Sequence, residues 1–279
     1  MNTQLINNEY FTAEIYIDVF NKRLRVDDLR GNIVEAINKA EEFVNVYQAE
    51  KLIIKGRQEH YLSLIEHGFQ CEAVIDNYFL GSNLYFFCKY YMNERKTSTQ
   101  WLQEDQIVKQ VLALKGTKQI IPPDNYEMKK CSHLDADALA SLYEKVFQIY
   151  PTPLNDPQYI RKTLDEGTIY YGFYTNGEIV SAASAEVNYF YKNAELTDCA
   201  TLPEHRKHGL MKILLERLEA DLKSNGIYCA YSIARSLSFG MNAALHQLGY
   251  SYRGRLMNNC NIFDKLEDMN VWVKNLSKE

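Results

Sequence analysis

The feature that most constrains the fold is a weak internal repeat, because it predicts two copies of one supersecondary unit. The matches, at or close to a shift of 178 residues, are Gly31 with Gly209, KLIIKGR (51–57) with CAYSIAR (229–235), and EHGF (66–69) with QLGY (247–250). In both copies the hydrophobic pattern follows the order helix, strand, helix, aromatic strand. We therefore expect two related α/β units in one chain.

The periodicity also predicts the elements around the repeat. The first half is expected to contain strands over 13–20, 23–28 and 51–56, helices over about 32–48, 57–68 and within 97–116, and a hairpin of 69–79 with 82–92. The second half is expected to contain strands over 126–132, 168–175, 177–191, 194–202, 227–234 and 250–263, helices over 133–150, 156–167, about 209–223 and 238–249, and a final strand or helix over 268–276. Two consecutive prolines in IIPPDNY (120–126) interrupt regular structure. We place the domain boundary there, with residues 1–120 as a smaller, partial copy and residues 123–279 as a complete one.

Composition narrows the function classes. A hydrophobic fraction of 46% and a charged fraction of 24% are typical of a globular protein, and no apolar run reaches the roughly 18 residues of a membrane span. The N-terminus shows no signal peptide, and a net charge of −5 without a basic domain argues against nucleic acid. Six scattered cysteines without a C-x-x-C pair indicate reduced thiols and no metal. We expect a cytoplasmic protein with no membrane partner, and a homodimer remains open.

The segment TLPEHRKHGLM (201–211) places a basic loop and one glycine between an apolar strand and an amphipathic helix. The first turn of a helix presents backbone N–H groups without intrahelical partners, and the helix dipole adds partial positive charge there. This combination favours binding of phosphate or pyrophosphate. The alternative is an ordinary strand-to-helix turn with solvated basic residues.

The element order and this loop resemble the GNAT acetyltransferase superfamily, whose acetyl-CoA loop follows the pattern R-x-x-G-x-G/A, here at Arg206, Gly209 and Met211. The resemblance implies a mixed twisted sheet flanked by helices, preceded by a partial GNAT-like domain. It also implies acetyl-CoA as cosubstrate, bound by Thr201, Leu202, Arg206, Lys207, His208, Gly209, Leu210 and Met211. The chain departs from the pattern at Lys207, where glycine is common, and at Met211, which replaces the last small residue.

A narrower resemblance covers nearly the whole chain. The segments YPTP (150–153), ELTDCATLPEHR (195–206), IARSLSFGMN (233–242) and EDMNVW (267–272) are similar to β-lysine N-acetyltransferases. Those enzymes acetylate the ε-amine of β-lysine, a product of lysine 2,3-aminomutase, and so make a compatible solute. The resemblance thus implies a small cationic amino acid as partner. Lysine, a polyamine or a protein lysine are alternative acceptors, and a non-catalytic acyl-CoA-binding or docking module is the alternative of another class.

Acetylation of an amine requires a group that accepts a proton, because a lysine-type amine has a pKa of about 10.4 and is mostly protonated at neutral pH. Glu195 and Asp198 lie on the strand that precedes the basic loop and are the candidate bases. Strand alternation places them on opposite faces, so only one of them faces the thioester unless a β-bulge intervenes.

The remaining candidates concern the acceptor and the leaving thiolate. Arg235 is the first choice for the acceptor carboxylate, with Arg253 and Arg255 as alternatives. Tyr150 is expected to contact the acceptor, and the candidates for its β-ammonium are Glu186, Asn258 and Asn259. Many GNAT enzymes have a tyrosine that protonates the thiolate, but the position that matches it here is Leu245. The acid therefore stays open, with Tyr250 and Tyr252 nearby in the sequence.

Overall fold

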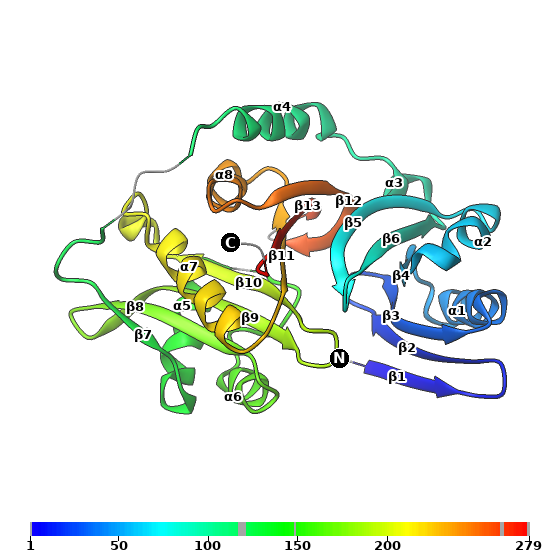
Figure 1. Cartoon of the computed structure of the whole chain (residues 1–279), viewed down its shortest axis with the longest axis horizontal. Coiled ribbons are helices and arrows are strands. Elements are labelled where there is room, and N and C mark those ends of the chain that lie inside the picture. Colours follow the sequence, from blue (N-terminus) through cyan, green and yellow to red (C-terminus); the bar gives the residue numbers. More distant parts are fainter. Residues whose placement is uncertain (1, 117–120, 148, 263–264, 278–279) are drawn as a thin grey trace.

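The computed structural model describes residues 2–116, 121–147, 149–262 and 265–277, and they form an α/β structure with helices on both faces of the sheet (Figure 1). The elements of the N-terminal half are β1 (Asn2–Asn7), β2 (Phe11–Asp18), β3 (Arg23–Gly31), α1 (Ile33–Tyr47), β4 (Lys51–Gly56), α2 (Tyr61–Glu66), β5 (Gln70–Phe79), β6 (Ser82–Tyr90), α3 (Asn93–Lys96) and α4 (Trp101–Leu112). Those of the C-terminal half are β7 (Glu127–Lys130), α5 (Ala136–Val146), α6 (Pro157–Asp165), β8 (Ile169–Thr175), β9 (Glu178–Asn188), β10 (Asn193–Thr201), α7 (Leu210–Ser224), β11 (Cys229–Arg235), α8 (Phe239–Gln247), β12 (Ser251–Ile262) and β13 (Lys265–Asn275).

These elements agree closely with the periodicity of the sequence. The final segment, for which strand and helix were both open, is strand β13. Strand β1 was not expected, because NTQLIN is mostly polar; it pairs antiparallel with β2 at the edge of the sheet. The predicted helix over 133–150 is shorter, since α5 ends at Val146, and residue 148 lies outside the described residues.

The two halves repeat one topology within a single 13-stranded sheet, in the order β1-β2-β3-β4-β6-β5-β12-β13-β11-β10-β9-β8-β7. In the first half β3 is parallel to β4 and β4 is antiparallel to β6. In the second half β10 is parallel to β11 and β11 is antiparallel to β13. The predicted boundary between domains falls partly on residues 117–120, which lie outside the described residues, and it stays a prediction.

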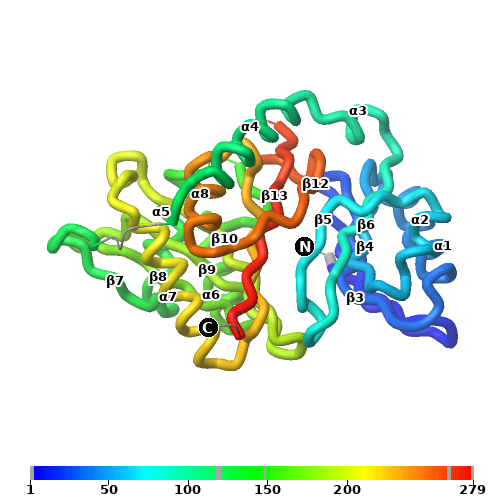
Figure 2. The backbone as a smooth tube through the Cα atoms, turned by 45° about the horizontal axis from the view of Figure 1, so that its top comes forward, coloured from blue at the N-terminus to red at the C-terminus, as the bar shows by residue number. Residues whose placement is uncertain are grey.

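The halves join where β5 pairs with β12, antiparallel at Ala73 and Gly254. Gly254 has φ +124°, and a Cβ at this position would lie 2.3 Å from the carbonyl oxygen of Glu72. Only glycine combines that backbone conformation with so close an approach of the neighbouring strand. The junction between the halves therefore depends on a residue without a side chain. Figure 2 shows α4 bridging the top of the molecule toward α8, against which it packs.

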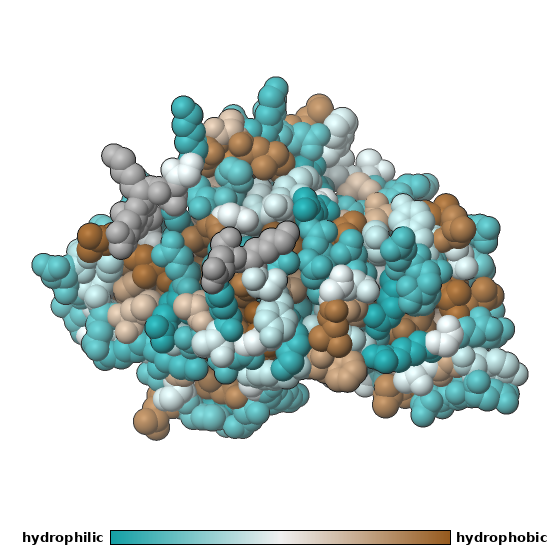
Figure 3. All heavy atoms as spheres, in the orientation of Figure 1, coloured by the Kyte–Doolittle hydropathy of each residue, from teal (hydrophilic) through white to brown (hydrophobic). Residues whose placement is uncertain are grey.

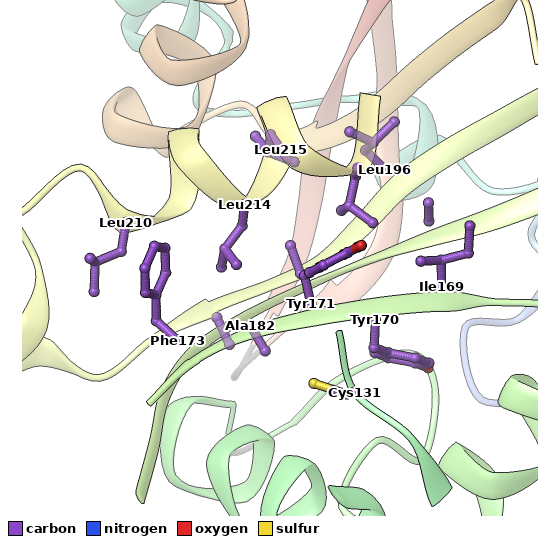
Figure 4. Close-up of a cluster of buried hydrophobic side chains, with 14 of the residues drawn as sticks. Cys131, Ile169, Tyr170, Tyr171, Phe173, Ala182, Leu196, Leu210, Leu214 and Leu215 are labelled. Carbon is purple, nitrogen blue, oxygen red and sulfur yellow. The ribbon is translucent and has the colours of Figure 1, made fainter. Parts of the chain in front are cut away.

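Helix α7 covers one face of the C-terminal part of the sheet. Leu210, Leu214 and Leu215 point toward Phe173 and Leu196 on the strands below, whereas Tyr170 and Cys131 lie on the opposite side of the sheet (Figure 4). The i, i+4 spacing of Leu210, Leu214 and Leu218 gives α7 the apolar stripe that this packing requires. Helices α5 and α6 pack on that opposite face.

Helix α1 covers one face of the N-terminal part of the sheet. Its buried residues Ala36, Ile37, Ala40 and Val44 belong to the same core cluster as Ile15, Val26 and Ile54 of β2, β3 and β4. The residues that alternate with these along each strand point to the other face of the sheet, and this face is directed to the C-terminal half. On the face of the molecule drawn in Figure 3, hydrophilic residues predominate and apolar ones form small groups.

Candidate active site

A cleft of about 950 Å³ opens where β10 and β11 separate. The two strands pair over Asn193–Glu195 and Cys229–Tyr231. Beyond that point, residues of 197–201 form one wall of the cleft and residues of 232–235 form the other. The first turn of α7 and the loop before it also line the cleft.

The loop before α7 leaves the start of this helix open to an anion. Gly209 precedes the helix in the left-handed conformation, with φ +69°, and no side chain caps the helix N-terminus. The corresponding helix of the first half, α1, is instead capped by Asn32, whose side chain accepts hydrogen bonds from the N–H groups of Val34 and Glu35. Arg206 and Lys207 add positive charge beside the uncapped turn. This donor set suits a pyrophosphate.

Most of the cofactor residues expected from the sequence lie in this cleft: Thr201, Arg206, Lys207, His208, Gly209, Leu210 and Met211. Leu202 instead is buried beside the cleft, and its N–H donates to the carbonyl oxygen of Val180 at 3.0 Å. Arg206 is held by its own loop, since its Nε donates to the carbonyl oxygen of Thr201 at 3.2 Å.

A second cavity, of about 780 Å³, lies between the two halves. Strands β2, β3 and β4 line it from the N-terminal half, and β9, β10 and β11 line it from the C-terminal half. The residues that border both this cavity and the cleft are Tyr150, Thr197, Asp198, Ile233, Ile262 and Met269. The two spaces therefore adjoin, and Asp198 is the ionisable carboxylate among the described residues at their junction.

Asp198 reaches this junction because strand β10 contains a bulge. Thr197 is opposite Ser184 of β9, but Ala200 is opposite Ala182, so β10 has one residue more than its partner between these pairs. Asp198 takes φ +51°, and its carboxylate accepts a hydrogen bond from Ser184 Oγ at 2.7 Å. Simple alternation would place Asp198 opposite Glu195, whereas the bulge brings both carboxylates into the cavity between the halves.

Burial and mutual repulsion hold these acids near their neutral form. Asp198 is 5% exposed. Burial raises its pKa to about 7, and the nearby Glu186 contributes in the same direction. Burial also raises the pKa of Glu195 to about 7, again with a contribution from Glu186. The pKa of Glu186 is raised by burial too, although Arg25 and Lys55 partly oppose the shift. Carboxyl groups whose pKa values are raised by burial and by neighbouring acids are typical of a site for a cationic ligand.

The structure brings together only some of the predicted acceptor residues. Tyr150 borders both spaces, and its hydroxyl lowers the pKa of Asp198. Glu186 and Asn259 line the cavity between the halves. Asn258 does not join them: its side chain donates to the carbonyl oxygens of Glu94, Arg95 and Thr97, where it ties β12 to the segment around α3.

Arg235 does not line the cavity between the halves, which we call the acceptor cavity because the predicted acceptor residues Tyr150, Glu186 and Asn259 line it. It lines the cleft between β10 and β11, which we call the cofactor cleft because most of the predicted cofactor residues lie there. The Nη2 atom of Arg235 is 2.8 Å from the buried carboxylate of Glu267. The two alternatives for the acceptor carboxylate are also engaged elsewhere. Arg253 pairs with Asp76, and Arg255 pairs with Glu104 and Asp105.

The position of the usual GNAT tyrosine contains no proton donor, because Leu245 is fully buried in the apolar core. Tyr250 and Tyr252 pack against this core and border neither space. Among the described residues, Tyr150 is the one tyrosine that lines the cofactor cleft. Burial raises its pKa well above the usual value, so its hydroxyl stays protonated at neutral pH.

Sequence reasoning missed the charged residues that the N-terminal half contributes. Glu14, Arg25, Asp27 and Lys55 line the same cavity as Asp198. They lie on segments correctly predicted to be strands, but no motif links them to residues more than 100 positions later in the chain. Their alternation along β2, β3 and β4 shows that they share one face, and the repeat is the signal that could have brought this face toward the site.

Two further observations concern the described part of the chain as a whole. It contains no group of three or more His, Cys, Asp or Glu side chains placed to hold a metal ion. None of its helices is both long enough and apolar enough to cross a membrane.

Comparison with known proteins shows the family of the chain. A model of the "Acetyltransferase (GNAT) family" matches residues 136–250. N-acetyltransferase YodP of Bacillus subtilis is 37% identical over 271 residues, which are 97% of this chain and 98% of that protein. Two proteins named β-lysine N(6)-acetyltransferase are also similar. The one from Methanococcus maripaludis is 34% identical over 93% of this chain and 95% of its own length, and the one from Methanosarcina mazei is 36% identical over 75% and 85%.

Proposed function

Because this chain belongs to the GNAT acetyltransferase family, whose members use acetyl-CoA, we propose that it acetylates the ε-amine of β-lysine. Two relatives are named for this activity, which supports β-lysine as the acceptor. They align over 93% and 75% of the chain. The third relative is named only as an N-acetyltransferase. The reaction class thus follows from the family, and the acceptor is the part that is proposed.

The position of Asp198 at the junction of the two spaces is the observation that carries the proposal. An acetyl group delivered through the cofactor cleft and an amine held between the halves would meet beside its carboxylate. A base with a pKa near the working pH is efficient at removing a proton from an ammonium group. Asp198 is the proposed base, and Glu195, which borders only the acceptor cavity, attracts the cationic end of the substrate.

The surroundings fit a direct transfer between two bound substrates. The uncapped start of α7, with Arg206 and Lys207, would hold the pyrophosphate, and the separated strands β10 and β11 would hold the pantetheine chain. Acetyl-CoA supplies the activated acetyl group. Asp198 takes the proton from the amine as the nitrogen attacks. The Tyr150 hydroxyl, in contact with Asp198, is the proposed proton donor to the departing thiolate.

A thiol-release assay with purified protein tests the acceptor. The protein is given acetyl-CoA with β-lysine, lysine or spermidine, and the site of acetylation is read by mass spectrometry. We expect kcat/KM for β-lysine to exceed the other two by about tenfold or more, because a polar group placed for the β-ammonium is left unpaired when lysine binds. Equal rates with lysine or spermidine would refute β-lysine as the acceptor and leave the acetyltransferase assignment intact.

A further inference from the structure

The face of the N-terminal sheet opposite α1 carries a row of charged residues toward the acceptor cavity. Tyr16 on β2 is in register with Arg25 on β3, and Arg25 is in register with Ile53 on β4. All three residues line the cavity. Asp27 and Lys55 follow two positions later on their strands and therefore point to the same side. This half of the molecule thus presents a polar surface to the acceptor cavity.

The row contains two acids, Glu14 and Asp27, and two cations, Arg25 and Lys55. Asp27 lies between two cations, with its carboxylate 2.5 Å from Arg25 Nε and 2.7 Å from Lys55 Nζ. Both cations therefore pair with the carboxylate of Asp27, and Glu14 supplies the second negative charge of the row. The hydrogen bonds of Arg25 to described residues leave from Nε and Nη2, both to Asp27. Its Nη1 is the end that a further carboxylate could approach, and Asp27 holds the guanidinium in place for it.

A buried acceptor atom without a hydrogen-bond partner lies in the same cavity. Asn259 is 6% exposed and lines the same cavity. Its Oδ1 is buried and has no hydrogen-bond partner among the described residues. Its backbone oxygen accepts a hydrogen bond from Arg23 Nη1 at 3.0 Å, and Arg23 is two residues before Arg25 on the same strand face. A buried amide oxygen without a donor is costly, which indicates that a donor arrives with a ligand.

The cavity therefore has two chemically different ends. On β9 and β10, Glu186, Glu195 and Asp198 form an anionic end beside the cofactor cleft. On β3 and β4, Arg25 and Lys55 supply the cations, each paired with Asp27, and the unpaired oxygen of Asn259 on β12 lies in the same cavity. A ligand with an amine at one end, and a carboxylate and a second ammonium at the other, matches both ends.

We propose that the N-terminal half is the acceptor-recognition half of this enzyme: Arg25 binds the carboxylate of the amino acid, and Asn259 Oδ1 accepts a hydrogen bond from its β-ammonium. This inference rests on the proposed function and adds to it the residues that select the acceptor. It also separates the roles of two arginines. Arg25 serves the acceptor, whereas Arg235 stays with Glu267 on the wall of the cofactor cleft.

Two truncated analogues of β-lysine test the two contacts separately. 1,4-Diaminopentane has both amines of β-lysine at the same spacing and lacks the carboxylate. 6-Aminohexanoate has the carboxylate and the distal amine and lacks the β-amine. Each is used as acceptor with the native enzyme and with Arg25→Met, Arg25→Lys and Asn259→Leu. Binding of β-lysine and of acetyl-CoA is measured in parallel by calorimetry.

Arg25→Met should lower kcat/KM for β-lysine and for 6-aminohexanoate about a hundredfold, and that for 1,4-diaminopentane less than about threefold. Asn259→Leu should lower kcat/KM about tenfold for β-lysine and 1,4-diaminopentane, and leave 6-aminohexanoate unchanged. The affinity for acetyl-CoA should stay constant in all variants. Turnover of the analogue that does not need the altered contact shows that the variant is folded.

Arg253→Met is the matched control, because Arg253 also pairs with a carboxylate of the N-terminal half, Asp76, but borders neither space. It should leave the ranking of the three acceptors unchanged. If Arg25→Met does not fold, Arg25→Lys carries the test, since it keeps the charge and loses the planar fork, with an expected intermediate loss for the two carboxylate-bearing acceptors.

The possible failures are distinguishable. A native enzyme that does not prefer β-lysine to lysine refutes the proposed function. A native enzyme that does prefer it, together with an Arg25→Met variant that affects all three acceptors equally or leaves β-lysine unaffected, overturns the assignment of Arg25. Likewise, an Asn259→Leu variant that affects all three acceptors equally or leaves β-lysine unaffected overturns the assignment of Asn259.

Discussion

At the scale of single residues, the candidate site depends on one backbone irregularity. Asp198 is a non-glycine residue at φ +51°, a conformation that is uncommon for an aspartate and is kept here by the surrounding strands. The bulge that imposes it turns a carboxylate into a cavity where Glu186 and Glu195 already lie. The ionised forms of these three acids repel one another. A cation bound among these acids would offset their repulsion.

Asp198→Asn should lower kcat at least about a hundredfold, because general base catalysis contributes roughly 10²–10⁴. In the native enzyme kcat/KM should rise as the pH passes about 7 and Asp198 loses its proton. The variant should lack this rise. Its thermal stability at pH 8 should equal or exceed that of the native protein. A carboxyl whose pKa is raised in the folded state stabilises the fold at low pH, and this contribution is lost as the pH rises through the folded pKa. A variant with native kcat would show that Asp198 is not the base.

Replacing either of two neighbours of Asp198 should shift the pH at which kcat/KM rises, and the two shifts should have opposite directions. Ser184 donates a hydrogen bond to the carboxylate and so lowers its pKa, whereas Glu186 raises it by repulsion. Ser184→Ala should therefore shift the rise in kcat/KM to higher pH, and Glu186→Gln should shift it to lower pH. The measurement is kcat/KM for β-lysine from pH 5.5 to 9. Shifts in the same direction would contradict the assignment of this rise to Asp198.

At the scale of elements, the start of α7 differs from the start of its counterpart α1 in one functional respect. Asn32 caps α1 with its own side chain, and Glu35 adds a negative charge to the first turn. Gly209 precedes α7 without a side-chain cap, and no acidic residue occupies its first turn. The repeat thus contains one helix that satisfies its own N–H groups and one that leaves them to a ligand.

Gly209→Val should raise the KM for acetyl-CoA about tenfold or more, because a β-branched residue is strained at φ +69° and the loop that presents the N–H groups must shift. Gly226→Val is the matched control. Gly226 ends the same helix with the same φ of +69° but lies outside the cofactor cleft. Both variants should lose a similar few degrees of melting temperature. A KM that changes equally in both variants would indicate general destabilisation rather than a local loss of cofactor binding.

The sequence was sufficient for most elements and for one of the two spaces. Alternation and helical spacing are local properties, so the strands around Tyr170 and Leu196 and the stripe of α7 could be predicted from them. The loop at Gly209 could be found because it lies between a strand and a helix in sequence as well as in space. The bulge at Asp198 could not, since a single extra residue shows only in the register of two paired strands. Arg25 and Lys55 could not be linked to the site either, because their placement depends on how two halves of the chain pack.

At the scale of the whole molecule, the two spaces are lined by different parts of the chain. The described residues of the cofactor cleft all come from position 121 onward, whereas the acceptor cavity takes residues from both halves. A continuous sheet joins the halves at β5 and β12, with Tyr78, Leu256 and Val271 among the apolar residues buried at the junction. Cofactor binding should therefore tolerate a disturbance of this junction better than acceptor binding does.

Gly254→Ala should separate the two binding events. A Cβ at Gly254 would clash with the carbonyl oxygen of Glu72 at 2.3 Å and force β12 away from β5. The acceptor cavity should widen, so KM for β-lysine should rise about tenfold or more while the affinity for acetyl-CoA changes less than about threefold. Gly81→Ala is the control, because Gly81 has a similar φ of +109° with nothing within 4 Å of the added carbon. This variant has the backbone strain without the clash. It should leave the KM for β-lysine and the affinity for acetyl-CoA unchanged. An equal loss of acceptor and acetyl-CoA binding in Gly254→Ala would mean that the junction supports the whole fold, and that the N-terminal half has no separate role in holding the acceptor.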